Sequence, residues 1–467
     1  MRVRALLGLA AAGALAACTA GPDYHLPGHA AANAPAAAGA FDAAREAAFS
    51  AAPLPDRWWA LYRDPLLDGL VADALAANTD LRAADANLRA ATAILRETEA
   101  ARTVQTAVSG GETVGRPAGT GGSLLGPLEY DLGLGASYPL DLAGRIRRAI
   151  EAARGDAEAA AAARDYVRTT VAAATARAYA SACAANVSLA AAGRVLDIQR
   201  QTLDATRRLQ RGGRGTAFDV TRAQAAVEQS AATVPAFLAQ RRAALYQLAA
   251  LAGRPPADYP RAVEGCAALP RIARPLPVGD GAALIRRRPD IRQAERSLAA
   301  ATARIGVATA QLYPAISIGG SAGLTGPVSG IGSGDAFRLA LGPLISWTFP
   351  NRRAVRAQIA RAGAGADAAL ANFDGTVIEA LRQAETALSG YARDRDRVAA
   401  LTRARDAAAT AAAQAGRLFR FGRAGFLDLL SAQATLASAE TTLAAAQTTL
   451  VDDEVSLFLA LGGGWQG

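Results

Sequence analysis

Residues 128–141 read LEYDLGLGASYPLD, and this stretch decides the fold because hydrophobic residues alternate in it with polar or small ones. A period of two residues places the hydrophobic side chains on one face of a β-strand. Residues 337–349, FRLALGPLISWTF, alternate in the same way. A weaker candidate strand and a glycine-rich loop precede each stretch, so the sequence predicts two β-hairpins. The expected strands are about 103–114, 127–141, 313–326 and 335–349.

A long stretch without proline follows each hairpin, over about 144–211 and about 352–421. Small and hydrophobic residues recur in both at spacings of three and four, which is typical of helices packed as coiled coils. A helix of this length would extend on the order of 100 Å, and its arginine and aspartate residues exclude it from a bilayer. Alanine lets helix backbones approach closely, so we expect such helices to pack side by side into a tube. Shorter return helices are expected over about 217–252 and 425–461.

The chain reads as two similar halves that are offset by about 210 residues. The heptapeptide NTDLRAA at 78–84 aligns with RPDIRQA at 288–294, and Asp219 aligns with Asp428. A duplicated fold that is mainly α-helical, with four β-strands, is therefore expected. The expected segments are a signal peptide over 1–17, an N-terminal linker over 18–56, a first repeat over 57–262, a linker over 263–279 and a second repeat over 280–467.

Counting strands predicts an oligomer. Four strands are too few to close a barrel, and an open sheet edge is not tolerated in lipid. Tyr130, Tyr138, Trp347 and Phe349 near the strand ends are typical of the aromatic girdle of a membrane barrel. Two chains would give eight strands around a filled interior, whereas three would give twelve strands around an aqueous lumen. We therefore expect a trimeric pore; the alternative is a soluble β-sandwich whose strands are half-buried.

The first eighteen residues predict export and lipidation. Arg2 and Arg4 precede an apolar run over 5–17 that is too short to remain in a bilayer as a spanning helix. The run ends in LAAC at 15–18, which resembles the lipobox of bacterial lipoproteins. We expect cleavage before Cys18, a lipid on the Cys18 thiol and an outer-membrane location. The alternative is an ordinary signal peptide with an incidental cysteine.

The composition excludes most enzyme classes. The two histidines, His25 and His29, both lie in the first thirty residues, so a histidine-based triad or metal site is not expected. The 467 residues include no lysine, which excludes a phosphate loop of the lysine-containing type. Three scattered cysteines do not have the spacing of a zinc or iron–sulfur site. We expect no enzyme activity, no metal, no cofactor other than the covalent lipid, and no nucleic-acid partner in spite of the formal charge of +9.

Several motifs together resemble the outer-membrane factor, or TolC-like, family, in its OprM/NodT-type lipoprotein branch. They are Cys18 followed by GPDY at 21–24, WW at 58–59, DPLL at 64–67, RPDIR at 288–292 and LGGGW at 461–465. The resemblance implies a trimer with a twelve-stranded outer-membrane barrel, a helical periplasmic barrel and a mixed equatorial region that contains the linker 263–279.

The resemblance also implies a function. Such a chain would be the passive exit channel of a tripartite efflux system, joined through a periplasmic adaptor to an RND-type pump in the inner membrane. Its cargo would be drugs or other small molecules, and multidrug resistance would follow. Two alternatives stay open: an exit duct for a type I protein secretion system, and a lipid-anchored coiled-coil scaffold without a lumen.

In this family the functional residues lie at the periplasmic tips, which correspond here to 210–218 and 419–427. Asp219 and Asp428 would each form a ring of three carboxylates that gates the lumen, with nearby arginines as counter-charges. The alternative is that each aspartate only caps its own helix. Ser431 stands where many relatives carry an aspartate, so a further acidic ring at position 431 is not expected. The candidate counter-charges are Arg214, Arg222 and Arg423, and the candidate adaptor contacts are Gly213, Gly215, Phe218, Gly422, Gly425 and Phe426.

Helix lengths suggest one disulfide. Cys183 lies about 28 residues, or roughly 42 Å of helix, from the first tip. The return helix would bring the chain back to a similar height just before Cys266. Because the periplasm is oxidising, a Cys183–Cys266 bond is our hypothesis, and two separate buried thiols are the alternative.

Overall fold

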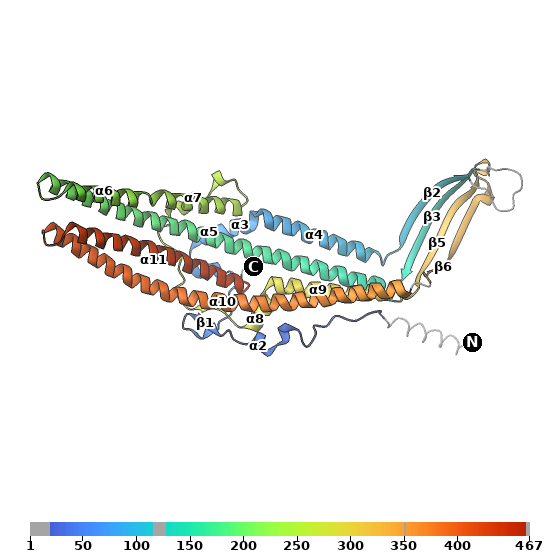
Figure 1. Cartoon of the computed structure of the whole chain (residues 1–467). Helices are drawn as coiled ribbons and strands as arrows, with labels where there is room; N and C mark the ends of the chain where they lie inside the picture. Colours follow the sequence, from blue (N-terminus) through green and yellow to red (C-terminus); the bar gives the residue numbers. More distant parts are fainter. Residues whose placement is uncertain (1–18, 115–127, 350–351, 464–467) are drawn as a thin grey trace. The chain divides into compact units, whose positions relative to one another are not determined.

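The computed structural model describes residues 19–114, 128–349 and 352–463 (Figure 1). The expected signal peptide, the lipidation site Cys18 and the terminal Trp465 lie outside the described residues. The described chain is mainly helical and forms two compact units. Each unit takes segments from both halves of the sequence. Unit 1 contains residues 19–30, 87–161 and 293–374, and unit 2 contains residues 31–86, 162–292 and 375–463.

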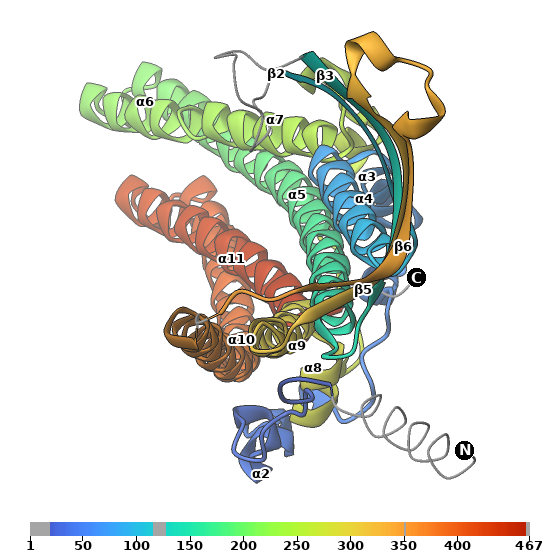
Figure 2. The same ribbon diagram turned by 90° about the vertical axis from the view of Figure 1, so that its right-hand side faces the viewer.

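Unit 1 contains a four-stranded antiparallel sheet, whose strands lie side by side in Figure 2. In pairing order the strands are β2 (Gln105–Val114), β3 (Leu128–Leu140), β5 (Ala315–Pro327) and β6 (Phe337–Ser346). The pairing of β3 with β5 joins the two hairpins and sets Leu132 opposite Leu324. Within the described residues, no strand pairs with the outer edge of β2 or β6. The side chains of Leu339 and Leu341 on β6 are 74% and 83% exposed in the single chain.

Helices continue from the sheet in unit 1. Most of α4 (Thr79–Ala100) and α9 (Pro289–Ala310) belong to this unit, together with the first parts of α5 (Arg145–Arg211) and α10 (Arg352–Arg420). Small residues let α5 and α9 approach closely, because a Cβ on Gly155 would lie only 3.0 Å from the Cβ of Ala300.

The N-terminal segment of unit 1 is held by a buried arginine. The Arg148 guanidinium donates to the Asp23 carboxylate at 2.7 Å, to the Glu151 carboxylate at 2.7 Å and to the Ala20 carbonyl at 3.1 Å. These partners leave the side chain of Arg148 only 4% exposed. Residues 20–23 are thereby fixed against the start of α5.

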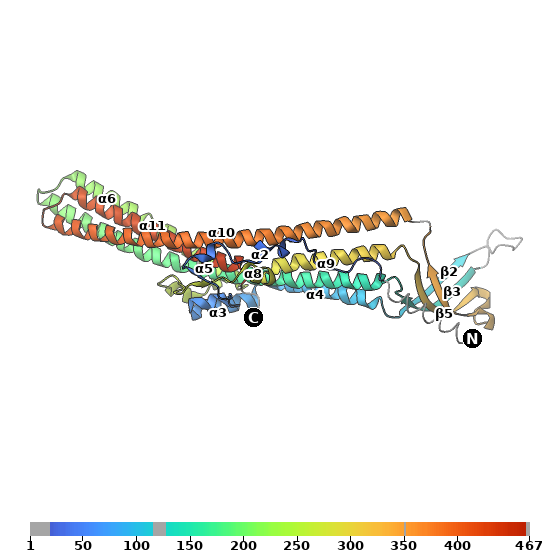
Figure 3. The same ribbon diagram turned by 90° about the horizontal axis from the view of Figure 1, so that it is seen from below.

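Unit 2 contains two antiparallel helical hairpins, which Figure 3 shows from below. The remainder of α5 pairs with α6 (Ala217–Ala231) and α7 (Val234–Leu251), and the remainder of α10 pairs with α11 (Phe426–Ala460). Shorter elements, α3 (Pro65–Ala77), α8 (Gly281–Arg287) and the parallel pair β1 (Phe49–Ser50) with β4 (Leu276–Pro277), complete this unit. None of the helices in the described ranges has both the length and the hydrophobicity needed to cross a bilayer.

The expected single return helix over 217–252 is wrong, because the structure has two helices separated at Ala232 and Thr233. Pro235 explains the interruption. Its ring lacks the N–H that would bond the carbonyl of Ala231 and would clash with that carbonyl in a continuous helix. The second return helix contains no proline over 426–460 and is continuous.

Candidate functional site at the helical tips

The first tip, residues 210–218, is a tight turn built by glycine. Gly213 has a φ of +69°, a backbone conformation that side chains disfavour. The Gly213 N–H donates to the Gln210 carbonyl at 3.0 Å, and the Arg214 N–H donates to the Leu209 carbonyl at 2.9 Å. This pattern is the Schellman motif, which satisfies the last carbonyl groups of α5.

The second tip, residues 419–427, repeats this geometry. Gly422 has a φ of +71°. Its N–H donates to the Phe419 carbonyl at 2.9 Å, and the Arg423 N–H donates to the Leu418 carbonyl at 2.9 Å. A Cβ on Gly422 would lie 3.9 Å from an Arg214 guanidinium nitrogen, so the two tips are neighbours in unit 2.

Both candidate gate aspartates bond to the start of their own helix. An Asp219 carboxylate oxygen accepts from the Thr216 N–H at 3.0 Å and from the Thr216 hydroxyl at 2.7 Å. The Asp219 N–H donates to the Thr216 hydroxyl at 3.2 Å, which completes a capping box. The bonds from the Thr216 hydroxyl and N–H lower the pKa of Asp219. Asp428 accepts one bond, from the Gly425 N–H at 3.1 Å.

The candidate counter-charges do not pair with these aspartates in the single chain. Among the described residues, no salt bridge joins Asp219 or Asp428 to Arg214, Arg222 or Arg423. The Arg222 guanidinium instead lies over the Phe218 ring, 5.5 Å from its centre. In the single chain, both aspartates therefore act as helix caps. A ring of carboxylates would need further copies of this chain.

The tips expose aromatic rings. Phe218 is 66% exposed and Phe421 is 79% exposed. Phe426, a predicted adaptor contact, packs instead against Phe419 with the ring centres 6.2 Å apart. Space at Gly215 is tight, since a Cβ there would lie 3.2 Å from the Gln210 backbone nitrogen. The tips thus expose two phenylalanine rings together with Leu418 and Leu427.

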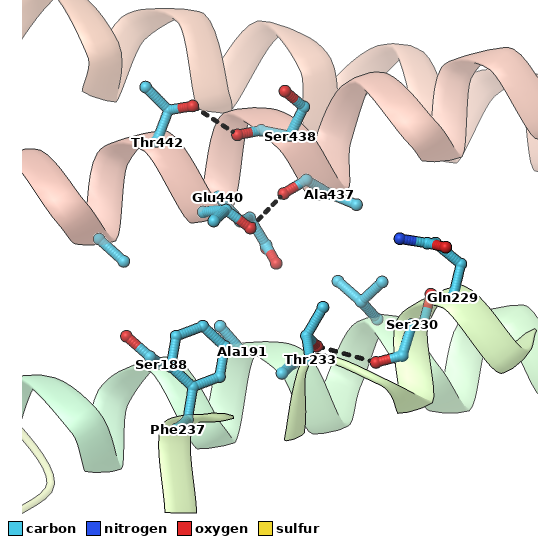
Figure 4. A pocket seen from close by; sticks show the side chains of 14 residues that line it. Ser188, Ala191, Gln229, Ser230, Thr233, Phe237, Ala437, Ser438, Glu440 and Thr442 are labelled. Atoms are coloured by element: carbon cyan, nitrogen blue, oxygen red, sulfur yellow. Dashed lines mark hydrogen bonds between the residues drawn. The ribbon is translucent and has the colours of Figure 1, made fainter. Parts of the chain in front are cut away.

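A groove lies behind the tips between α5, α6, α7 and α11 (Figure 4). Two cavities of about 430 Å³ and about 880 Å³ share Ser188, Phe237, Thr441 and Ala444, so they adjoin. Alanine, serine and threonine form most of the lining, and Phe237 is the largest side chain in it. Small side chains leave the helix backbones accessible at this surface.

The structure joins Cys183 and Cys266 in a disulfide with the Cα atoms 5.2 Å apart. The Asn186 amide, one turn along α5, donates to the carbonyls of Val263 and Cys266 at 3.3 and 3.1 Å. The linker is thereby fixed to α5.

Ser431 lies on α11, where its carbonyl accepts from the Thr435 hydroxyl. Within the described ranges, no group of three histidine, cysteine, aspartate or glutamate residues is placed to bind a metal.

Sequence reasoning missed a buried polar cluster in unit 2, which we call the Glu454 cluster: Trp58, Tyr62, Tyr391, Glu454 and Phe458. The Tyr62 hydroxyl donates to the Glu454 carboxylate at 2.9 Å, and the Tyr391 hydroxyl does so at 3.5 Å. Burial raises the pKa of Glu454 to about 7, because the two hydroxyl groups only partly offset the loss of water. No local pattern predicts this cluster, since its members come from three distant segments.

A second buried arginine supports the same region. The Arg288 guanidinium donates to the Ala460 carbonyl at 2.8 Å, to Gln383 at 3.1 Å and to Asp290 at 2.6 Å. It connects α9, α10 and the end of α11. Arg288 lies in the RPDIR motif, so here the sequence carried a signal whose structural role was not recognised.

Comparison with known proteins assigns the family. The family model described as "Outer membrane efflux protein" matches residues 70–254 and 282–463. The antibiotic efflux pump outer membrane protein ArpC of Pseudomonas putida is 30% identical over 97% of this chain and 93% of its own. Nodulation protein T of Rhizobium leguminosarum bv. viciae is 30% identical over 97% of this chain and 92% of its own.

Solved structures agree with this assignment. The outer-membrane channel OprN has a TM-score of 0.89 at 37% identity and covers 96% of this chain and 100% of its own. The open state of the MtrE channel of Neisseria gonorrhoeae has a TM-score of 0.82 at 29% identity and covers 96% of this chain and 99% of its own. The chain belongs to the outer membrane efflux protein family and is an outer-membrane protein of the TolC-like fold.

Proposed function

We propose that this protein is the passive outer-membrane exit channel of a tripartite RND-type efflux system that exports drugs or other small molecules. An inner-membrane pump would supply the energy, and a periplasmic adaptor would join the pump to the helical tips. The similarity to OprN over 96% of the chain carries the proposal. Channel action requires passage rather than catalysis, so we expect no enzyme activity and no cofactor besides a covalent lipid on Cys18.

We propose a homotrimer as the active form. The outer edges of β2 and β6 have no strand beside them in the described chain, and such edges are costly in lipid. Three copies of the sheet would make twelve strands, pair every edge and leave a lumen. The hydrophobic residues that β6 exposes would then face lipid.

The tips are the proposed contact with the adaptor and the proposed gate. Phe218 and Phe421 are exposed, and the Arg222 guanidinium lies over the Phe218 ring. Aromatic residues and arginine are enriched in protein–protein interfaces. The capping carboxylates of Asp219 and Asp428 keep free oxygen lone pairs, so in a trimer they can also line a narrow lumen. Gly213 and Gly422 would act through the turn geometry they permit.

Planar-bilayer conductance of the purified, full-length protein tests the channel. We expect trimers by native mass and stepwise conductance, with more cation selectivity in the wild type than in Asp219→Asn/Asp428→Asn. The variant keeps both side chains' length and an acceptor oxygen for the cap. A monomer without conductance would refute the channel and support the lipid-anchored scaffold.

Crosslinking in native membranes distinguishes the two transport functions. Recovery of an adaptor and an RND-type pump with this chain would support efflux. Recovery of an ABC exporter would support a type I secretion duct instead.

Metabolic labelling with a fatty acid tests the proposed lipid on Cys18. The Cys18→Ala variant should not incorporate the label if the lipobox is used.

A further inference from the structure

One end of the β-sheet carries a group of exposed arginines. Strand pairing sets Gln105 opposite Ser137 and Ala315 opposite Ser346, so β2 and β5 begin where β3 and β6 end. The helices α5 and α10 start from this same end of the sheet. We call the arginines there the arginine collar: Arg102, Arg145, Arg147, Arg352 and Arg353, all exposed.

The collar residues lack carboxylate partners. Within the described residues, none of their side chains forms a salt bridge or a hydrogen bond. Other arginines of unit 1 are paired: Arg296 bonds to Glu158 at 3.2 Å, and Arg304 bonds to Asp156 at 2.5 Å. The nearest carboxylate at the start of α5, Asp141, is used by the N–H groups of Ile146 and Arg147 at 2.9 and 2.8 Å.

The position of the collar adds to its charge. A helix N-terminus carries a positive partial charge, which favours acidic residues and disfavours arginine. The helices α3, α4, α6, α9 and α11 follow this rule with an aspartate in the first turn. The helices α5 and α10, which leave the sheet, begin with arginines and have no acidic residue in the first turn, as is also the case for α7 and α8. At α5 the Asp141 carboxylate, which precedes the helix, accepts the N–H groups of Ile146 and Arg147 instead. No carboxylate of the described residues is bonded to the start of α10, so an anion supplied from outside the chain would offset the positive charge there.

A cavity and a set of aromatic rings indicate what kind of anion fits. A cavity of about 350 Å³ is lined by Arg102 and Arg147 together with apolar side chains such as Leu142. The Asp141 carboxylate also lines it, but each of its oxygens already accepts a backbone N–H, from Ile146 and Arg147. At the same end of the sheet, Tyr138, Tyr313, Trp347 and Phe349 are between 45% and 68% exposed. Aromatic rings next to arginines are typical of the headgroup level of a bilayer.

We propose that the arginine collar binds anionic phospholipid headgroups, with one headgroup phosphate held in the cavity between Arg102 and Arg147. The collar continues directly from the exposed hydrophobic strands, so an acyl chain can lie along the sheet while its phosphate meets the arginines. The ligand would come from the periplasmic leaflet of the outer membrane. This site is independent of the cargo and of the pump.

Lipid titration of the purified full-length protein in neutral detergent tests the proposal. Phosphatidylglycerol and phosphatidylcholine would be titrated separately, with bound lipid counted by native mass spectrometry and the melting temperature followed. Each arginine near an anionic lipid contributes about 1 kcal/mol, which is about fivefold in affinity. The variant Arg102→Gln/Arg147→Gln should therefore bind phosphatidylglycerol on the order of 25-fold more weakly. Arg102→Lys/Arg147→Lys keeps both charges and should retain most of the affinity.

The matched control removes two exposed, unpaired arginines from unit 2, in Arg242→Gln/Arg403→Gln. This variant should bind phosphatidylglycerol as the wild type does. An equal loss in the control, no preference for phosphatidylglycerol in the wild type, or equal protection by inorganic phosphate alone would each overturn the proposal. If the double glutamine variant does not fold, Arg353→Gln provides the same test at the start of α10, with an expected loss of about fivefold.

Discussion

The Glu454 cluster and the two tips belong to the same unit but are built in opposite ways. In the cluster, Trp58 is fully buried and stacks on Phe458 with the ring centres 4.8 Å apart. At the tips, Phe218 and Phe421 are largely exposed, and turn and cap hydrogen bonds supply the order. Behind the tips, the buried residues include Leu203, Ala223 and Val227 in one small group, and Leu429 in the first turn of α11.

This difference shows how one protein can combine a region that is held by buried contacts with a region that has few of them. Buried aromatic contacts and satisfied buried charges make local opening costly, whereas segments with few buried apolar contacts open at low cost. The disulfide and the buried hydrogen bonds of Arg288 also hold segments together that are distant in the sequence. The comparison predicts large effects of substitution in the Glu454 cluster and small effects at the tips.

The largest effect is expected for Trp58→Ala. Removing a fully buried indole leaves a cavity beside Phe458, and such substitutions cost about 3–5 kcal/mol of unfolding free energy. The control Phe421→Ala removes an exposed ring at the second tip and should change stability by no more than about 0.5 kcal/mol. Denaturant unfolding in detergent, followed by circular dichroism, measures both. Similar losses of unfolding free energy in the two variants would show that the cluster and the tips do not differ in this way.

The disulfide should contribute the next largest effect. It closes a loop with a sequence separation of 83 residues, and disulfides of this kind stabilise by about 2–4 kcal/mol. Cys183→Ala/Cys266→Ala should therefore melt at a lower temperature than the wild type. Reductant should lower the melting temperature of the wild type and leave that of the variant unchanged. A reductant effect on the variant would point to another cause.

The pH dependence of stability sharpens the comparison further. The pKa of Glu454 is about 7 in the folded chain, above its ordinary value of 4.5. Between these values the unfolded chain releases the proton and the folded chain keeps it. The stabilisation is therefore full below pH 4.5 and is lost as the pH rises through about 7, which amounts to roughly 2 kcal/mol between pH 5 and 7.

Glu454→Gln isolates this contribution, because the amide has no charge to titrate and can still accept from Tyr62. The difference in stability between wild type and variant should move in favour of the variant as the pH rises from 5 to 7. Asp219→Asn at the first tip is the control and should show no such trend with rising pH. A pH-independent difference for Glu454→Gln would contradict the assigned role.

The smallest effects are expected from the helix caps. Asp219→Ala removes both bonds to Thr216 and should destabilise the start of α6 by about 1 kcal/mol. Amide hydrogen exchange in the first turn of α6 should then be about fivefold faster. Asp428→Ala removes a single bond from Gly425 and should have a smaller effect on α11. Equal acceleration at the two tips would show that the caps do not explain their difference.

The sequence by itself determined the kinds of element and their order, since these depend on local patterns. Alternation over 128–141 and 337–349 indicates strands, and residues 128–140 and 337–346 are strands in the structure. The proline-free stretches correspond to helices of 67 and 69 residues. Pro235 is also a local signal, because a proline inside a helix interrupts it. The expected continuous helix over 217–252 was wrong because it did not take this proline into account.

Tertiary structure alone decided which side chains meet. Asp219 and Asp428 were expected as gate residues or caps, and their capping bonds became visible only with the backbone in place. Tyr62, Tyr391 and Glu454 are separated by up to 392 residues in the chain, yet they share hydrogen bonds. The environment that raises the pKa of Glu454, and the lack of salt bridges at the arginine collar within the described residues, are likewise properties of packing. Local periodicity records which face of an element is apolar, but burial and charge pairing depend on partners that only the folded chain brings together.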